Sequence, residues 1–374
     1  MSRTVNADQE LFVDVTRRFI AEHCPTSTVR TWSAEPLGYD DQWWSRGADL
    51  GWTSALVPEA LGGGSVSDSG LIDLTLIADA FGDAAAPGPL TSVNVVIDAL
   101  ARDGGADHLR RWIGSLLDGS VTAAWCAPEL AADGRGFDLS VRATADGQDL
   151  LLNGVARQVL GGDGASLLLV PTRVDDADAH VLLDATATGL TIEPLQTLDL
   201  VQRVARLEFA DVRVDRAAAI GTANSVERAF QVGLAIQLAE TVGAMGKLFE
   251  ITHEWLLDRY SFGRPLGSYQ AIKHRFADAR MWLEACRAAA AAAAHAVQEE
   301  APIAAELVSV AKAFTAHRGP ELAHECIQFH GGIGVTSEHD LHLYARRVIQ
   351  NSALLGGMGE HRQRVAAILC GRMQ

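Results

Sequence analysis

The sequence of 374 residues is poor in cysteine and in basic side chains. Its five cysteines are widely spaced, odd in number and free of any CxxC pair, which excludes a disulfide framework and a zinc site of the usual spacing. Lysine and arginine number 31 against 47 aspartates and glutamates, and the net charge of −16 repels nucleic-acid phosphates. We therefore expect reduced thiols, no bound metal and no nucleic-acid partner.

Long apolar runs are also missing. No window reaches the roughly 18 consecutive apolar residues that a membrane span requires. The first residues, MSRTVNADQELF, have no cationic segment followed by an apolar one, so they do not form a signal peptide. With 48% hydrophobic and 21% charged residues, the composition is that of a globular protein. We expect a cytoplasmic protein with no membrane span and with more than one domain.

Three regions differ in the spacing of their apolar residues. Residues 1–120 and 221–374 repeat them every three or four positions, which is the helical period, whereas residues 121–220 consist of short runs separated by Gly, Asp and Asn. The sequence therefore predicts an α+β multidomain fold. We expect an N-terminal helical domain, a middle antiparallel β barrel or sandwich and a C-terminal four-helix bundle, with these boundaries.

Two segments of the last region combine glycine with charged or aromatic side chains. The first, RYSFGRPLGSYQAIKH, runs from Arg259 to His274 and joins two expected helices. Its arginines can pair with phosphate oxygens, and its glycines let a ligand approach the backbone. The second, QFHGGIGV over residues 328–335, places glycines between two helices. By spacing alone, the first segment is as compatible with a basic loop, and the second with a helix C-cap.

Together, the two segments resemble the FAD-binding signature of the acyl-CoA dehydrogenase family, in which RxxFGxPxGxxQ precedes QxxGGxGV. The order of helical, β and helical regions extends the resemblance over nearly the whole chain. It implies an FAD cofactor, an acyl-CoA substrate that is oxidised to the 2-enoyl-CoA, and an electron-transfer flavoprotein as electron acceptor. The middle region matches less well, because Pro128 and Glu129 stand where many members carry a Thr-Glu-Pro stretch.

The resemblance also implies particular FAD-contacting residues. They are Arg259, Phe262, Gln270, Gln328, Gly331 and Gly332. The first two resemble residues that reach the cofactor across a subunit interface, the third resembles a polar contact, and the last three resemble the contacts near the adenosine. Because the family builds each flavin site from two chains, we expect a homodimer, a homotetramer or a heterotetramer with a homologous subunit.

The catalytic base departs from the family pattern. Removal of the α-proton of an acyl thioester needs a carboxylate in a pocket emptied of water. Counting from the second motif places the usual glutamate at Leu355, and the alternative position on the preceding helix falls at Gly233. Neither residue is a base. Glu360 lies close to Leu355, but in the first turn of an expected exposed helix, where a carboxylate stabilises the helix dipole.

Glu240 is the remaining candidate, two helical turns beyond Gly233 on the same face of an otherwise apolar helix. Because an unpaired carboxylate is costly to bury, its presence there indicates a function. We predict Glu240 as the catalytic base of an acyl-CoA dehydrogenase. Two alternatives for this residue and this chain stay open. Glu240 can be paired with an arginine in the core, and the chain can be a non-catalytic partner that completes FAD sites in a hetero-oligomer. A flavin oxidase or monooxygenase on the same fold is a further alternative.

Overall fold

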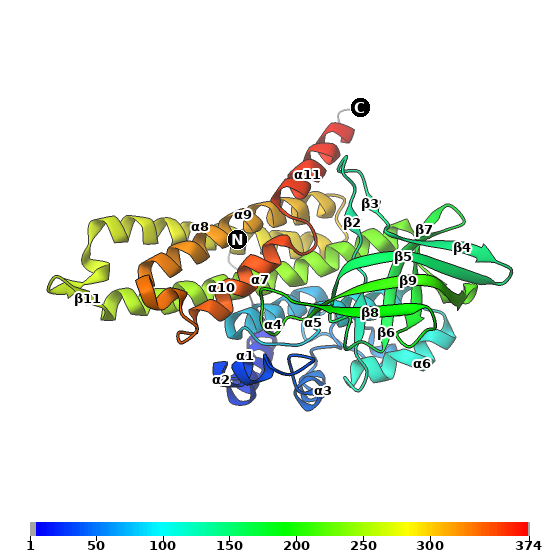
Figure 1. Ribbon diagram of the computed structural model, residues 1–374, viewed down its shortest axis with the longest axis horizontal. Coiled ribbons are helices and arrows are strands. Elements are labelled where there is room, and N and C mark those ends of the chain that lie inside the picture. Colours follow the sequence, from blue (N-terminus) through cyan, green and yellow to red (C-terminus); the bar gives the residue numbers. More distant parts are fainter. Residues whose placement is uncertain (1–4, 373–374) are drawn as a thin grey trace.

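Helices at both ends of the chain flank a β region in the computed structural model, which describes residues 5–372 (Figure 1). This order confirms the predicted fold class. The N-terminal part begins with a capping box in which Asn6 and Gln9 bond each other's backbone N–H groups. Its α-helices are α1 (Ala7–His23), α2 (Thr26–Trp32), α3 (Asp41–Asp49), α4 (Gly70–Ala84), α5 (Leu90–Asp103) and α6 (Ala106–Leu117).

The middle part contains two four-stranded sheets with the strand orders β1-β6-β7-β10 and β4-β5-β9-β8. Within them all neighbouring strands are antiparallel except β1 and β6, which pair in parallel. Apolar side chains from both sheets share one core, as in a sandwich. The strands are β1 (Ala123–Trp125), β4 (Val141–Asp146), β5 (Asp149–Leu160), β6 (Leu167–Val174), β7 (Ala177–Asp184), β8 (Leu190–Leu195), β9 (Val204–Asp215) and β10 (Ala219–Ile220), with a separate pair of β2 (Glu129–Leu130) and β3 (Phe137–Asp138).

Three long helices lie side by side in the C-terminal part, and two shorter ones pack on them (Figure 1). A small hairpin, β11 (Tyr260–Ser261) and β12 (Arg264–Pro265), connects the first two long helices at the end of the bundle farthest from the sheets. The helices are α7 (Ala223–Asp258), α8 (Gln270–Gln298), α9 (Ala304–His330), α10 (Leu341–Ala353) and α11 (Met358–Arg372).

Two glycines let α4 and α7 cross at close range. A Cβ atom on Gly82 would lie 1.8 Å from the carbonyl oxygen of Glu240, and one on Gly243 would lie 2.0 Å from that of Asp79. Any larger residue at either position would force the helices apart. The crossing brings the middle of α7 against the end of α4, and this contact positions the polar groups described below.

Helix α7 is long and apolar enough to cross a membrane, but 83% of its most apolar window is buried within the protein. It is therefore the central core helix of the fold. Four cysteines are buried as well, and Cys370 is exposed. All five are free thiols, as the sequence predicted.

His180 on β7 should make the protein sensitive to acid. It is fully buried, and burial lowers its pKa to about 4. Between pH 6.5 and 4 the unfolded chain protonates His180 and the folded chain does not, so this residue causes no loss of stability above pH 6.5 and a loss of about 1.4 kcal/mol per pH unit below it. Urea unfolding at pH 7 and at pH 5 measures this effect. The free energy of unfolding should fall between the two pH values by about 2 kcal/mol less in His180→Leu than in the wild type. The exposed His324→Leu serves as the control, and equal losses in the wild type and His180→Leu would contradict this assignment.

Candidate functional site

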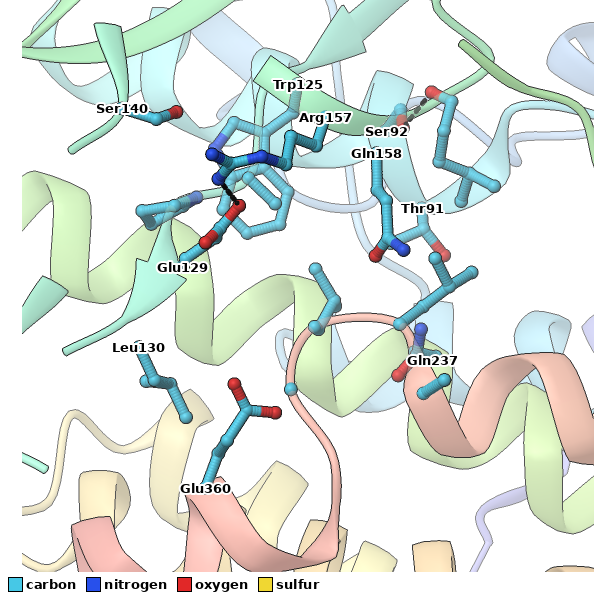
Figure 2. A pocket seen from close by; sticks show the side chains of 17 residues that line it. Thr91, Ser92, Trp125, Glu129, Leu130, Ser140, Arg157, Gln158, Gln237 and Glu360 are labelled. Atoms are coloured by element: carbon cyan, nitrogen blue, oxygen red, sulfur yellow. Dashed lines mark hydrogen bonds and ion pairs between the residues drawn. The ribbon is translucent and has the colours of Figure 1, made fainter. Parts of the chain in front are cut away.

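A cavity of about 330 Å³ lies where the β region meets α5, α7 and the loop between α10 and α11 (Figure 2). This volume is within the range of small-molecule sites. Its walls mix apolar and polar side chains. They include Thr91, Ser92, Trp125, Pro128, Glu129, Ser140, Arg157, Gln158, Gln237, Leu354, Leu355, Gly356 and Glu360.

Both carboxylates that line the cavity already have partners. Glu129 accepts a hydrogen bond of 2.9 Å from Arg157, and the two side chains face each other in Figure 2. Glu360 accepts a hydrogen bond of 2.7 Å from the backbone N–H of Gly357 at the start of α11. The helix-start role that the sequence suggested for Glu360 matches this contact.

Leu355 lies in the wall of this same cavity. Its backbone has a φ of +60°, a left-handed conformation that costs a non-glycine residue about 1 kcal/mol or more. The loop that carries it runs between α10 and α11, beside Glu360 (Figure 2). The position at which the motif spacing predicts the glutamate therefore reaches the cavity, but here it presents an apolar side chain.

Glu240 does not line the cavity. It is 7% exposed, and its carboxylate lies 2.7 Å from a guanidinium nitrogen of Arg347 on α10. Amide groups of Gln202 and Asn351 donate further hydrogen bonds of 3.1 and 3.2 Å to the same carboxylate. Burial raises the pKa of Glu240, while the charge of Arg347 and the hydrogen bond from Asn351 oppose that rise.

Arg347 connects Glu240 to the rest of the molecule. Its guanidinium also pairs with Asp199 in the β8–β9 connection and donates to the carbonyl oxygens of Ala85 and Ala86 after α4. Burial disfavours the charged form of Arg347, but the two carboxylates raise its pKa above the ordinary value. Asp199 in turn accepts hydrogen bonds from the backbone of Val201 and Gln202. We call Arg347, Glu240 and Asp199 the buried charge cluster.

This geometry bears directly on the prediction that Glu240 is the base. The sequence left open whether this acid is paired, and the structure gives its carboxylate one cation and two amide donors. The arrangement matches the alternative interpretation, a carboxylate paired with an arginine in the core. A general base needs a free lone pair directed at the substrate, and the side chain that α7 presents to the cavity is Gln237.

The two glycine-containing motifs come together at the other end of the bundle. Trp255, near the end of α7, donates a hydrogen bond of 3.2 Å to the carbonyl oxygen of Phe329 at the end of α9. Its ring also stacks on His330, with centroids 5.1 Å apart. The Arg259 guanidinium lies 5.7 Å from the centroid of the Trp255 ring. Tertiary packing thus joins two segments that are far apart in the sequence.

The FAD-contact residues predicted from the motifs are all exposed on this chain. Phe262 is 96% exposed at the tip of the hairpin, and Gln270 begins α8. Gln328 lies in the last turn of α9, and Gly331 and Gly332 follow it with no atom within 4 Å of an added Cβ. Among residues 5–372, Arg259 has no ion pair with a carboxylate. An unpaired cation beside open backbone fits the diphosphate of FAD, so this end is compatible with one side of a dinucleotide site.

The sequence did not reveal that Arg347 and Lys312 are buried. Arg347 follows Arg346, which donates to the carbonyl oxygen of Leu198. Lys312 is buried in α9. The helical spacing of Tyr344, Arg347 and Asn351 places all three on the buried face of α10. From that spacing, the burial of Arg347 could have been predicted.

The comparison with known sequences identifies the class of protein. The acyl-CoA dehydrogenase N-terminal domain matches residues 6–120, and the acyl-CoA dehydrogenase C-terminal domain matches residues 221–369. These matches cover more than half of the chain, which therefore belongs to the acyl-CoA dehydrogenase family.

Its relatives include proteins of mycobacteria. The chain is 31% identical over 330 residues to acyl-CoA dehydrogenase FadE27 of Mycobacterium tuberculosis, with 85% of each chain covered. The ChsE4-ChsE5 complex of the same organism contains a chain that is 25% identical, with a TM-score of 0.91 and 99% of each chain covered. A Tcur3481-Tcur3483 steroid acyl-CoA dehydrogenase variant is 27% identical, with a TM-score of 0.90 and the same coverage.

Removal of Arg347 should destabilise the protein far more than removal of a surface arginine. Arg347→Met leaves two buried carboxylates without their cation, and we expect a loss of about 3–5 kcal/mol in the free energy of unfolding. Arg110→Met, which breaks an exposed pair with Asp107, should lose less than about 1 kcal/mol. Denaturant titration measures both. Adding Glu240→Gln to Arg347→Met should recover part of the loss, and equal losses in the two single variants would refute the importance of the cluster.

Proposed function

We propose that this chain is the non-deprotonating subunit of a hetero-oligomeric acyl-CoA dehydrogenase, in which it completes an FAD site with a homologous partner. The chain thus takes the partner role that the sequence left open, and Glu240 is not its catalytic base. One observation carries it: Leu355 occupies the cavity wall where the family glutamate is expected, while Glu129 and Glu240 pair with arginines and Glu360 bonds the backbone at the start of α11.

The separation of the cavity from the hairpin supports an FAD site that is shared between two chains. The cavity lies at the β region, whereas Arg259 and Phe262 lie at the hairpin end of the bundle (Figure 1). In the assembly, the Arg259 guanidinium would pair with a phosphate of FAD, and Gly331 and Gly332 would allow the adenosine side to approach the backbone. Bound FAD would accept the hydride from the β-carbon of the acyl-CoA, while the partner chain would supply the carboxylate that takes the α-proton.

The substrate class and electron acceptor follow from the family and its relatives. Acyl-CoA thioesters are the substrates expected for an acyl-CoA dehydrogenase, and an electron-transfer flavoprotein is the expected acceptor. The likeness to a steroid acyl-CoA dehydrogenase supports a bulky substrate such as a sterol side-chain thioester. The likeness to the ChsE4-ChsE5 complex supports assembly with a homologous chain.

Co-expression tests this proposal. The chain should be produced alone and together with a second acyl-CoA dehydrogenase chain that carries the loop glutamate. Alone, it should bind little flavin and should not bleach with acyl-CoA under anaerobic conditions. The complex should be yellow and should bleach. A flavin-loaded chain that bleaches and turns over by itself would refute the non-catalytic role.

Substitution of Glu240 separates the two interpretations of that residue. A general base typically contributes about 10²–10⁴-fold to the rate. In the active complex, Glu240→Gln should change kcat by less than about threefold, whereas glutamine in place of the partner's loop glutamate should abolish most activity. A loss of 10²-fold or more in Glu240→Gln, with the complex intact and flavin bound, would restore Glu240 as the base. Rapid oxygen consumption by the reduced complex would instead indicate an oxidase.

Arg259 should matter for flavin retention in the complex. Arg259→Met removes a charge-assisted contact worth about 1.5–3 kcal/mol, so the FAD dissociation constant should rise by roughly 10- to 100-fold. Arg280→Met is the matched control, because Arg280 is an exposed arginine of α8 that pairs with Glu284 at 3.0 Å. Flavin fluorescence during dilution measures both. Equal retention of FAD by the two variants would remove Arg259 from the cofactor site.

A further inference from the structure

Lys312 is a buried cation that the proposed function does not use. It lies in the first half of α9, is 2% exposed, and has no ion pair with a carboxylate among the residues that the structure describes. Burial lowers its pKa to about 7, and the charge of Glu360 opposes that effect. Since a lysine is rarely buried without carboxylate partners, its remaining contacts must account for its position.

Three oxygen atoms surround the Lys312 ammonium group. It donates to the side-chain oxygen of Gln237 at 2.6 Å and to the carbonyl oxygens of Asn351 and Leu354 at 2.5 and 2.7 Å. An ammonium group has three N–H donors, so its donor capacity is filled. The two carbonyls belong to the end of α10, where the helix dipole also favours a cation.

Two of these three acceptors belong to residues of the cavity wall. Gln237 forms the part contributed by α7, and Leu354 begins the loop that continues through Leu355 and Gly356. The next carbonyl in that loop, from Leu355, lies 2.8 Å from the Nε2 atom of His361 on α11. Burial lowers the pKa of His361 to about 3, so the ring is neutral, and its Nε2–H donates to this carbonyl.

The loop therefore has two successive carbonyls fixed from inside the protein, on either side of a residue with unfavourable backbone geometry. Leu355 adopts its left-handed conformation between the contact to Lys312 and the contact to His361. Conformations of this kind persist where the surroundings hold them in place. Without the ammonium group, the Leu354 carbonyl would lose its cation and the loop would be free to relax.

We propose that Lys312 is a positioning residue for the cavity: its ammonium group ties the loop of residues 354–357 to Gln237 and so sets the separation of two cavity walls. This role concerns the shape of the pocket and is independent of which chain supplies the catalytic base. It also explains why a charged side chain is retained in the core, where a methionine of similar length would avoid the cost of burial.

Local hydrogen exchange tests the proposal in the full chain. The amides of Leu354 and Gly357 are suitable reporters because both are hydrogen-bonded, to the Gln350 carbonyl and the Glu360 carboxylate respectively. In Lys312→Met, peptides that contain these amides should exchange at least about tenfold faster, as expected for the loss of one charge-assisted hydrogen bond. Lys312→Gln, which keeps two N–H donors, should give an intermediate increase and provides the test if Lys312→Met does not fold.

The controls distinguish positioning from general destabilisation. Ser309→Ala removes another fully buried polar group from α9, whose hydroxyl has no hydrogen-bond partner within residues 5–372, and should leave the loop unchanged. Peptides from β6 report on the core of the sheets and should exchange at the wild-type rate in all variants. Unchanged exchange at residues 354–357 in a folded Lys312→Met protein would overturn the proposal, as would an equal acceleration in β6.

Discussion

Pairing of the buried Arg347 guanidinium is the constraint on which the interior depends. The cation is removed from water, so it requires anions, and the two that it receives come from α7 and from the β8–β9 connection. Its remaining N–H groups bond carbonyls that follow α4. All three regions of the chain thus meet at one side chain. Amides of Gln202 and Asn351 bind the Glu240 carboxylate and offset the excess negative charge.

The polar interior continues from this cluster to the cavity without a break. Asn351 donates its side-chain amide to Glu240 and receives the Lys312 ammonium group at its backbone carbonyl. Lys312 in turn reaches the loop that carries Leu355. The charges thus hold the frame around the pocket, and the loop itself presents Leu354 and Leu355 to the cavity. A reactive carboxylate needs the opposite arrangement, with the acid facing the ligand and its partners kept away.

Local sequence patterns predicted the fold and the exposed motifs because those features depend on neighbouring residues. Helical and strand spacing identified the three regions, and the glycine segments were recognisable as loops between helices. The partner of Glu240 could not be predicted in this way, because Arg347 and Asp199 lie on other elements far along the chain. The sequence did show that an acid in an apolar helix needs an explanation. The sequence could not show whether the Glu240 carboxylate is there to bind a counter-ion or to act on a substrate, because either role accounts for a buried acid.

The hairpin between α7 and α8 has a consequence for how the protein behaves in solution. Phe262 exposes nearly all of its ring, and its backbone is held in a left-handed conformation with a φ of +51°. Where such a ring is covered on association, binding of the partner raises the free energy of unfolding with the logarithm of the partner concentration once that concentration exceeds the dissociation constant. In the proposed assembly, the melting temperature therefore rises with the concentration of the chain and of its partner, and a single value measured on dilute protein underestimates the stability of the complex.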